Sequence, residues 1–147
     1  MAEVIFRKLV SDDRYLSGRV HVTSAGTANW HVGNQMDLRA RTALDRAGFA
    51  LAGSPGAFAD SEYLNHQDIV VVMTREHVHE VTQRLINELV QVIMLRNLLE
   101  PGGNLDVADP YYGSDKDFDE CLELITQCAL RLTWECRRRL GEDSNEA

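Results

Sequence analysis

The sequence has few cysteines and prolines, no surplus of positive charge and no long apolar run. Among its 147 residues, 23 are acidic and 15 are basic, which gives a net charge of -8. This balance argues against a nucleic-acid surface or an anionic-membrane surface, because both need basic patches. The apolar runs fall well short of the roughly 20 residues that span a membrane, and the start lacks a signal-peptide pattern. We therefore expect a cytoplasmic protein with no membrane or nucleic-acid partner.

The three cysteines are odd in number and lie close together, at Cys121, Cys128 and Cys136. This arrangement does not suit a disulfide framework and favours a reducing compartment. Their spacing of seven and eight residues places them along one stripe of a helix, where free thiols behave as small buried hydrophobes. His77 and His79 are two positions apart, so they do not share a helix face and make a poor metal pair. We predict no metal site and no organic cofactor.

The length fits one domain, which we place at residues 1–140, followed by a disordered tail at 141–147. Helical periodicity marks five segments. They are Met1–Val10, Asp37–Ala47, a short helix from Asp60 or Ser61 to Leu64, Glu76–Leu85 and Phe118–Leu140. Three β-rich stretches lie between them, at Val20–Ser24, Ile69–Met73 and Val90–Leu95. The alternation predicts an α/β fold with a parallel sheet, in which Ile69–Met73 is a central strand buried on both faces.

The stretch Asp109-Pro110-Tyr111-Tyr112-Gly113 combines a candidate catalytic acid with two aromatic rings. Pro110 stiffens the chain, and Gly113 permits a reversal directly after the two phenol rings. An acid beside aromatic walls suits a flat aromatic ester whose leaving oxygen needs a proton. The simpler interpretation is a surface loop with two half-exposed tyrosines.

Two further features have simple structural interpretations. Trp30 and His31 lie in a loop of small residues, where the indole could cover the core. The first helix begins at residue 1 without an N-cap, which fits either a frayed helix or a chain that has lost a preceding segment.

Taken together, these blocks resemble the low-molecular-weight protein-tyrosine-phosphatases. The resemblance runs through almost all of the chain. It is carried by Met1-Ala2-Glu3 with Phe6-Arg7, Val22-Thr23-Ser24-Ala25-Gly26-Thr27, Trp30-His31-Val32-Gly33, Asp37 with Arg39-Ala40, and Asp109-Pro110-Tyr111-Tyr112-Gly113 with Phe118.

The resemblance implies a three-layer α/β/α fold with a four-stranded parallel sheet. It also implies hydrolysis of phosphotyrosine, in a protein or a small aryl phosphate, through a phosphocysteine intermediate. By the match, Asp109 is the general acid and base. Trp30, His31, Tyr111 and Tyr112 bind the aromatic substrate, and Ser24 supports the phosphate loop.

The chain also departs from the family. The first strand and the C-x5-R-S phosphate loop, which the family places directly before the helix that starts here at Met1, are absent. No cysteine of this chain has an arginine six positions later, since Gln127, Trp134 and Glu142 stand there. Thr74 occupies a position where the family usually has an aspartate.

Three functions remain open at this point. The first is a phosphatase whose sequence is truncated at the N-terminus, so that these 147 residues alone are inactive. The second is a non-catalytic binding or interaction protein of the same fold. The third, arsenate reduction, needs a cysteine relay that the clustered thiols do not supply.

Overall fold

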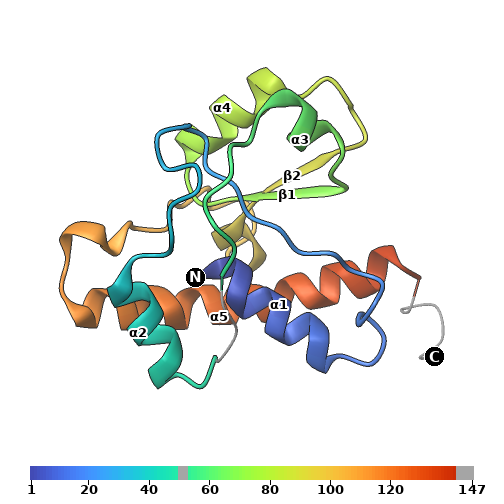
Figure 1. Ribbon diagram of the computed structural model, residues 1–147. Helices are drawn as coiled ribbons and strands as arrows, with labels where there is room; N and C mark the ends of the chain where they lie inside the picture. Colours follow the sequence, from blue (N-terminus) through green and yellow to red (C-terminus); the bar gives the residue numbers. More distant parts are fainter. Residues whose placement is uncertain (50–52, 142–147) are drawn as a thin grey trace. The chain divides into compact units, whose positions relative to one another are not determined.

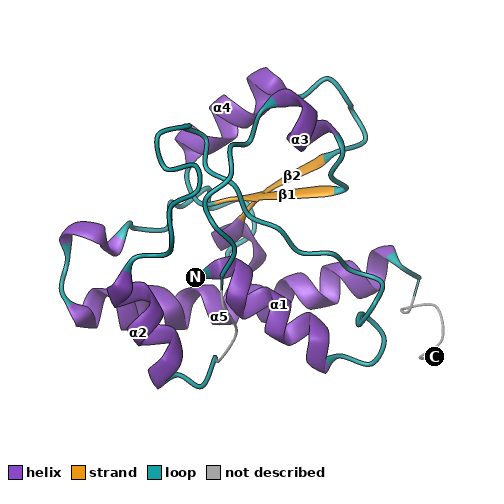
Figure 2. Cartoon of the chain, in the orientation of Figure 1, coloured by secondary structure: helices purple, strands orange, loops and turns teal. Residues whose placement is uncertain are grey.

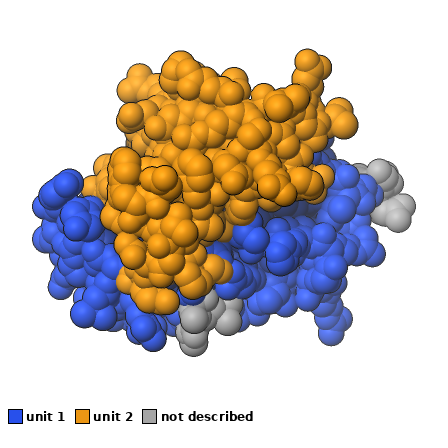
Figure 3. Space-filling view, turned by 45° about the horizontal axis from the view of Figure 1, so that its top comes forward, with its two compact units in different colours: residues 1–23, 37–53, 110–147 blue, residues 24–36, 54–109 orange. Residues whose placement is uncertain are grey.

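The computed structural model describes residues 1–49 and 53–141. The chain forms two compact units, which Figure 3 distinguishes by colour. Unit 1 comprises Met1–Thr23, Asp37–Gly53 and Pro110–Ala147, and unit 2 comprises Ser24–Met36 and Ser54–Asp109.

Unit 2 contains a parallel pair of strands covered by two helices (Figures 1 and 2). Strand β1 (Ile69–Val72) pairs with β2 (Gln91–Met94), and Val72 lies opposite Met94. Helix α4 (Arg75–Arg84) forms the crossover between them, and α3 (Ser61–Asn65) precedes β1. Their apolar side chains form one core, which contains Ala59, Leu64, Val72, Val81 and Met94. The short 3-10 helix η1 (Leu95–Leu98) follows β2 directly.

A second, shorter parallel contact joins Gly26 to Phe58 in unit 2. The N–H of Gly26 donates to the carbonyl of Ala57 at 2.8 Å, and the N–H of Ala59 donates to the carbonyl of Gly26 at 2.9 Å. Arg84 reinforces this contact, because its guanidinium donates to the carbonyls of Ala59 and Thr27 at 3.0 and 2.9 Å.

Unit 1 is helical and is built on α5 (Asp115–Arg139), against which α1 (Ala2–Asp12) and α2 (Leu38–Arg46) pack. The buried residues include Val4 and Ile5 of α1, Ala43 and Leu44 of α2, and a stripe of α5. This stripe comprises Phe118, Leu122, Ile125, Cys128, Ala129, Leu132 and Cys136. Helix α1 has no side-chain cap, as its sequence predicted.

The five predicted helices are confirmed, as are the strands expected at Ile69–Met73 and Val90–Leu95. The strand predicted at Val20–Ser24 is wrong, since within the described part of the chain these residues join no ladder. The prediction that β1 is buried on both faces is also wrong, because only Val72 of its four residues is fully buried. The predicted tail lies outside the described residues beyond Gly141.

None of the helices formed by the described residues combines the length and the apolar character that crossing a membrane requires.

The link between Asp13 and Arg137 generates a stability prediction for unit 1. The carboxylate of Asp13 accepts hydrogen bonds from Nε and Nη2 of Arg137 at 2.9 and 2.6 Å, and from the main-chain N–H groups of Tyr15 and Leu16. Burial acts to raise the pKa of Asp13, but these hydrogen bonds, those of Arg137 foremost, outweigh it and lower the pKa. We expect Asp13→Asn to reduce the free energy of unfolding at pH 7 by about 1–3 kcal/mol.

The effect should depend on pH with a definite sign. Because the pKa is lower in the folded chain, the stabilisation is complete above the unfolded pKa and is lost as the pH falls through the folded value. Urea titrations should therefore show the difference between the wild type and Asp13→Asn narrowing below about pH 4. Asp12→Asn is the control, since exposed Asp12 pairs with Lys8 on the same helix and its loss should cost roughly 0.5 kcal/mol. An equal cost for both variants would contradict the assignment.

Candidate active site

The predicted acid–aromatic loop adopts a tight turn that leads into α5. Asp109 is followed by a 3-10 turn at Pro110–Tyr112 (η2), which is closed by a 2.8 Å hydrogen bond from the N–H of Gly113 to the carbonyl of Pro110. Ser114 then caps α5, with its N–H donating to Asp117 at 2.6 Å. The Asp117 side chain comes so close to Gly113 that a Cβ there would lie 2.5 Å from a carboxylate oxygen. The turn therefore has little room for a larger residue.

The two tyrosine rings form an edge-to-face pair in unit 1. Their centroids are 4.9 Å apart at an interplanar angle of 82°. Tyr111 is 54% exposed and Tyr112 is 94% exposed, so both rings present aromatic surface for contact. The edge-to-face geometry of such a pair contributes about 0.5–1.5 kcal/mol of interaction free energy, which favours one relative orientation of the rings.

Arg39 holds the first of these rings, a role that sequence reasoning missed. Its guanidinium lies 5.3 Å from the ring centroid of Tyr111 and 4.7 Å from that of Phe118. Asp37 fixes the guanidinium through Nε–Oδ1 and Nη2–Oδ2 contacts of 3.2 and 2.9 Å. The bonds from Arg39 lower the pKa of Asp37, and the same side-chain bond raises the pKa of Arg39, so both groups keep their charges. The sequence offered one signal, the pattern Asp37-x-Arg39 at a helix start.

Trp30 and His31 lie on an exposed loop of unit 2. Their rings are 6.3 Å apart in an edge-to-face arrangement, and the His31 ring nitrogen Nδ1 is 3.2 Å from the Asn34 amide nitrogen. Trp30 is 75% exposed, so the interpretation that it covers the core is wrong. The loop instead presents its indole to solvent.

Gly56 anchors the Trp30 loop. The N–H of Gly33 donates to the carbonyl of Gly56 at 2.7 Å, and the N–H of Gly56 donates to the carbonyl of Asn34 at 2.8 Å. The backbone approach is close, because a Cβ at residue 56 would lie 2.2 Å from the carbonyl oxygen of His31.

The predicted site residues are distributed over both units. Ser24, Trp30, His31 and Asp109 belong to unit 2, and Tyr111 and Tyr112 belong to unit 1. The structure pairs Trp30 with His31 and Tyr111 with Tyr112. It places Ser24 and Asp109 on the exposed part of unit 2.

The cysteines are placed as structural thiols. Cys128 and Cys136 are buried and Cys121 is half-buried, so the expectation of core thiols holds fully for two of the three. Burial raises the pKa of the Cys136 thiol, which keeps it protonated and unreactive. Within residues 1–49 and 53–141, no group of three or more His, Cys, Asp or Glu residues is placed to hold a metal ion.

Comparison with known proteins decides the family. Residues 1–145 match the family described as low molecular weight phosphotyrosine protein phosphatase. The chain belongs to this family. A low molecular weight protein-tyrosine-phosphatase of Streptomyces coelicolor is 35% identical over 137 residues, which cover 90% of this chain and 82% of that protein.

Solved structures of the family share the fold. A protein tyrosine phosphatase from Entamoeba histolytica superposes with a TM-score of 0.81 at 22% identity, covering 96% of this chain and 88% of that one. Wzb of Vibrio vulnificus, solved in complex with benzylphosphonate, gives a TM-score of 0.76 at 20% identity, covering 91% and 87%. The predicted α/β/α fold class with a parallel sheet is thus confirmed.

The anchor at Gly56 generates the prediction for this loop. We expect Gly56→Ala to displace the His31 carbonyl, because the added methyl overlaps it, and to lower the free energy of unfolding by about 1–3 kcal/mol. In a Trp134→Phe background, Trp30 is the one remaining tryptophan, so its fluorescence should change in the folded state. Gly26→Ala is the control, since its Cβ would meet the carbonyl oxygen of Ala28 at an ordinary contact distance of 3.5 Å. Unaltered emission in Gly56→Ala would refute the anchor.

Proposed function

We propose that this chain provides the acid and the aromatic walls of a phosphatase that hydrolyses phosphotyrosine or aryl phosphate monoesters. The observation that carries the proposal is the direct connection of Asp109 to the ordered Tyr111–Tyr112 pair, in a chain that belongs to this family. A carboxyl group next to flat apolar faces suits a substrate whose leaving group is a phenol.

The reaction takes two steps. In the first, a cysteine thiolate attacks phosphorus and the P–O bond to the phenol breaks, while Asp109 donates its proton to the leaving oxygen. In the second, the Asp109 carboxylate takes a proton from water as that water attacks the phosphocysteine. Inorganic phosphate leaves, and both the thiolate and the protonated Asp109 are restored. Neither step needs a metal ion or an organic cofactor.

The other candidate residues serve binding. Trp30, His31, Tyr111 and Tyr112 contact the aromatic ring of the substrate, and Ser24 supports the phosphate loop. The benzylphosphonate bound to Wzb combines a phosphonate with an aromatic ring, which supports this class of substrate. Residues 1–140 act as one phosphatase-like domain, in a reducing compartment such as the cytoplasm that preserves the thiolate.

The nucleophile is not among these 147 residues, because no cysteine is followed by an arginine at the sixth position. This observation favours a second candidate function for the chain as it stands, a non-catalytic binding protein of the same fold. The two functions differ in whether a thiolate supplied from outside these residues restores turnover.

The role of Asp109 can be tested in a chain that carries the cysteine nucleophile. We define the extended chain as these 147 residues preceded by the first strand and C-x5-R-S loop of a family member. Asp109→Asn in the extended chain should lower kcat for phenyl phosphate by about 100-fold or more, because the leaving phenolate loses its proton donor. Circular dichroism should stay the same. Asp115→Asn changes a nearby exposed carboxylate and should leave turnover within about twofold. Full turnover in Asp109→Asn would sink the general-acid assignment.

The second prediction concerns the 147 residues alone. They should release no measurable phosphate from phenyl phosphate, with or without a thiol reductant, because they contain no activated thiolate. The extended chain assayed in parallel should be active and lose its activity when its loop cysteine is replaced by serine. Thiol-dependent turnover by the 147 residues alone would show that one of Cys121, Cys128 or Cys136 acts as a nucleophile.

A further inference from the structure

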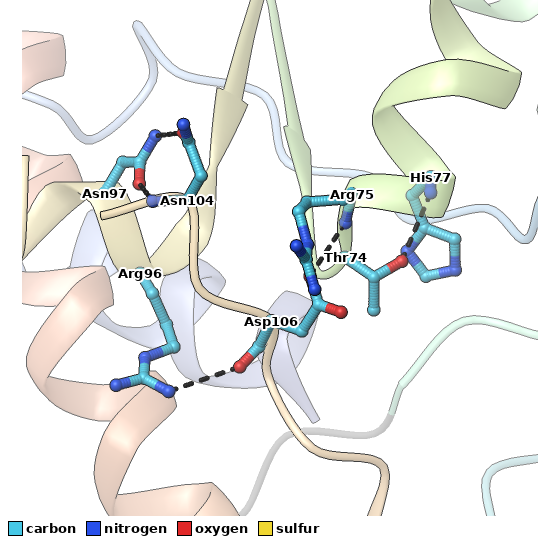
Figure 4. A network of polar contacts seen from close by, with 7 residues as sticks. All are labelled: Thr74, Arg75, His77, Arg96, Asn97, Asn104 and Asp106. Atoms are coloured by element: carbon cyan, nitrogen blue, oxygen red, sulfur yellow. Dashed lines mark hydrogen bonds and ion pairs between the residues drawn. The ribbon is translucent and has the colours of Figure 1, made fainter. Parts of the chain in front are cut away.

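The segment that leads to Asp109 is held by hydrogen bonds at two consecutive residues of unit 2, Asp106 and Val107. Val107 is buried, and its N–H donates to the carbonyl of Met73, next to the end of β1, at 2.8 Å. The carboxylate of Asp106 accepts from the main-chain N–H of Arg75 at 2.9 Å and from Arg75 Nε at 3.4 Å (Figure 4). Both contacts tie the segment to the junction of β1 and α4.

Asp106 is also held through its main chain. Its carbonyl oxygen accepts from Nη1 of Arg96 at 3.3 Å, and Nη2 of the same guanidinium donates to Glu100 at 2.8 Å. Figure 4 shows the Arg96 guanidinium reaching Asp106 from the turn that follows β2. Residue 106 is therefore fixed from two directions.

The charge of Asp106 matches the helix end that it contacts. Thr74 is the N-cap of α4, and its hydroxyl accepts from the N–H of His77, which leaves the N–H of Arg75 to Asp106. The hydrogen bond from this N–H is the main cause that lowers the pKa of Asp106, assisted by the charges of Arg75 and His77. The carboxylate is thus ionised at neutral pH, next to the positive end of the α4 dipole.

We propose that Asp106 is a positioning residue for Asp109. Asp106 holds the start of the short segment that carries the general acid. This inference rests on the proposed function. Only Ala108 separates buried Val107 from Asp109, so a displacement at residue 106 passes directly to the acid. Misplacement of a catalytic group by about 1 Å can cost up to 100-fold in rate. If Asp106 acted only as a helix cap, its loss would lower stability and leave the proton transfer unaffected.

Leaving-group dependence separates the two roles. Phenyl phosphate needs its leaving oxygen protonated, whereas the far weaker base released from 2,4-dinitrophenyl phosphate does not. In the extended chain, we expect Asp106→Ala to lower kcat/KM for phenyl phosphate by roughly tenfold and for 2,4-dinitrophenyl phosphate by less than about twofold, because kcat/KM reports only the steps up to release of the phenol.

A second variant tests the same contact without altering Asp106. Arg75→Pro removes both donors to the carboxylate, and proline is tolerated at this first helical position because the preceding Thr74 is already extended, with φ -136° and ψ 162°. It should reproduce the selective loss on phenyl phosphate. Arg75→Ala keeps the main-chain N–H and should have a smaller effect.

Asp60→Ala is the matched control. Asp60 caps α3 in the same unit by accepting a hydrogen bond from the N–H of Tyr63 at 2.8 Å. Asp60→Ala should therefore lower the free energy of unfolding by an amount comparable to Asp106→Ala, with no change in leaving-group dependence. If Asp106→Ala and Arg75→Pro lower kcat/KM for both esters equally, or not at all, while Asp109→Asn remains impaired, the positioning role is wrong and the proposed function stands. If the unmodified extended chain turns over neither ester, the proposed function fails, and the positioning role fails with it.

Discussion

The parallel pairing of β1 with β2 is the constraint on which the rest of unit 2 depends. Parallel strands need a crossover, and α4 provides it by packing Val81 against Val72 and Met94. The same pairing brings the carboxyl ends of both strands to one edge, so that the carbonyl of Met73 and the side chain of Arg96 reach the same short segment. Asp106 and Val107, which lead to Asp109, therefore take their position from the ends of the strands rather than from their own conformational preferences.

In unit 1 the corresponding element is α5. It supplies the buried stripe for α1 and α2, and its first turn carries Phe118, which shares the guanidinium of Arg39 with Tyr111. The capping box at Ser114 and Asp117 closes the turn that precedes it. A single helix start thus combines a cap, a core residue and the support of an aromatic surface.

The sequence predicted those parts of the fold whose causes are local. Apolar periodicity was sufficient to locate the helices, and a continuous β-branched run located β1. Val20–Ser24 has the composition of a strand, but a strand also needs a partner with which to form a ladder, and composition does not reveal one. For the candidate site, the order of Asp109, Tyr111 and Tyr112 was readable because they lie in one pentapeptide. The contact of Asp106 with Arg75 spans 31 residues and that of Arg39 with Tyr111 spans 72, so neither leaves a local pattern.

The division of unit 1 into three chain segments has a consequence for synthesis on the ribosome. Helix α1 is made before unit 2, yet the stripe against which it packs lies on α5, which is made after every segment of unit 2. All residues of unit 2 are therefore synthesised before α5, against which α1 packs. The apolar face of α1 lacks its α5 partner until α5 emerges, so nascent chains should depend on protection of this face up to that point.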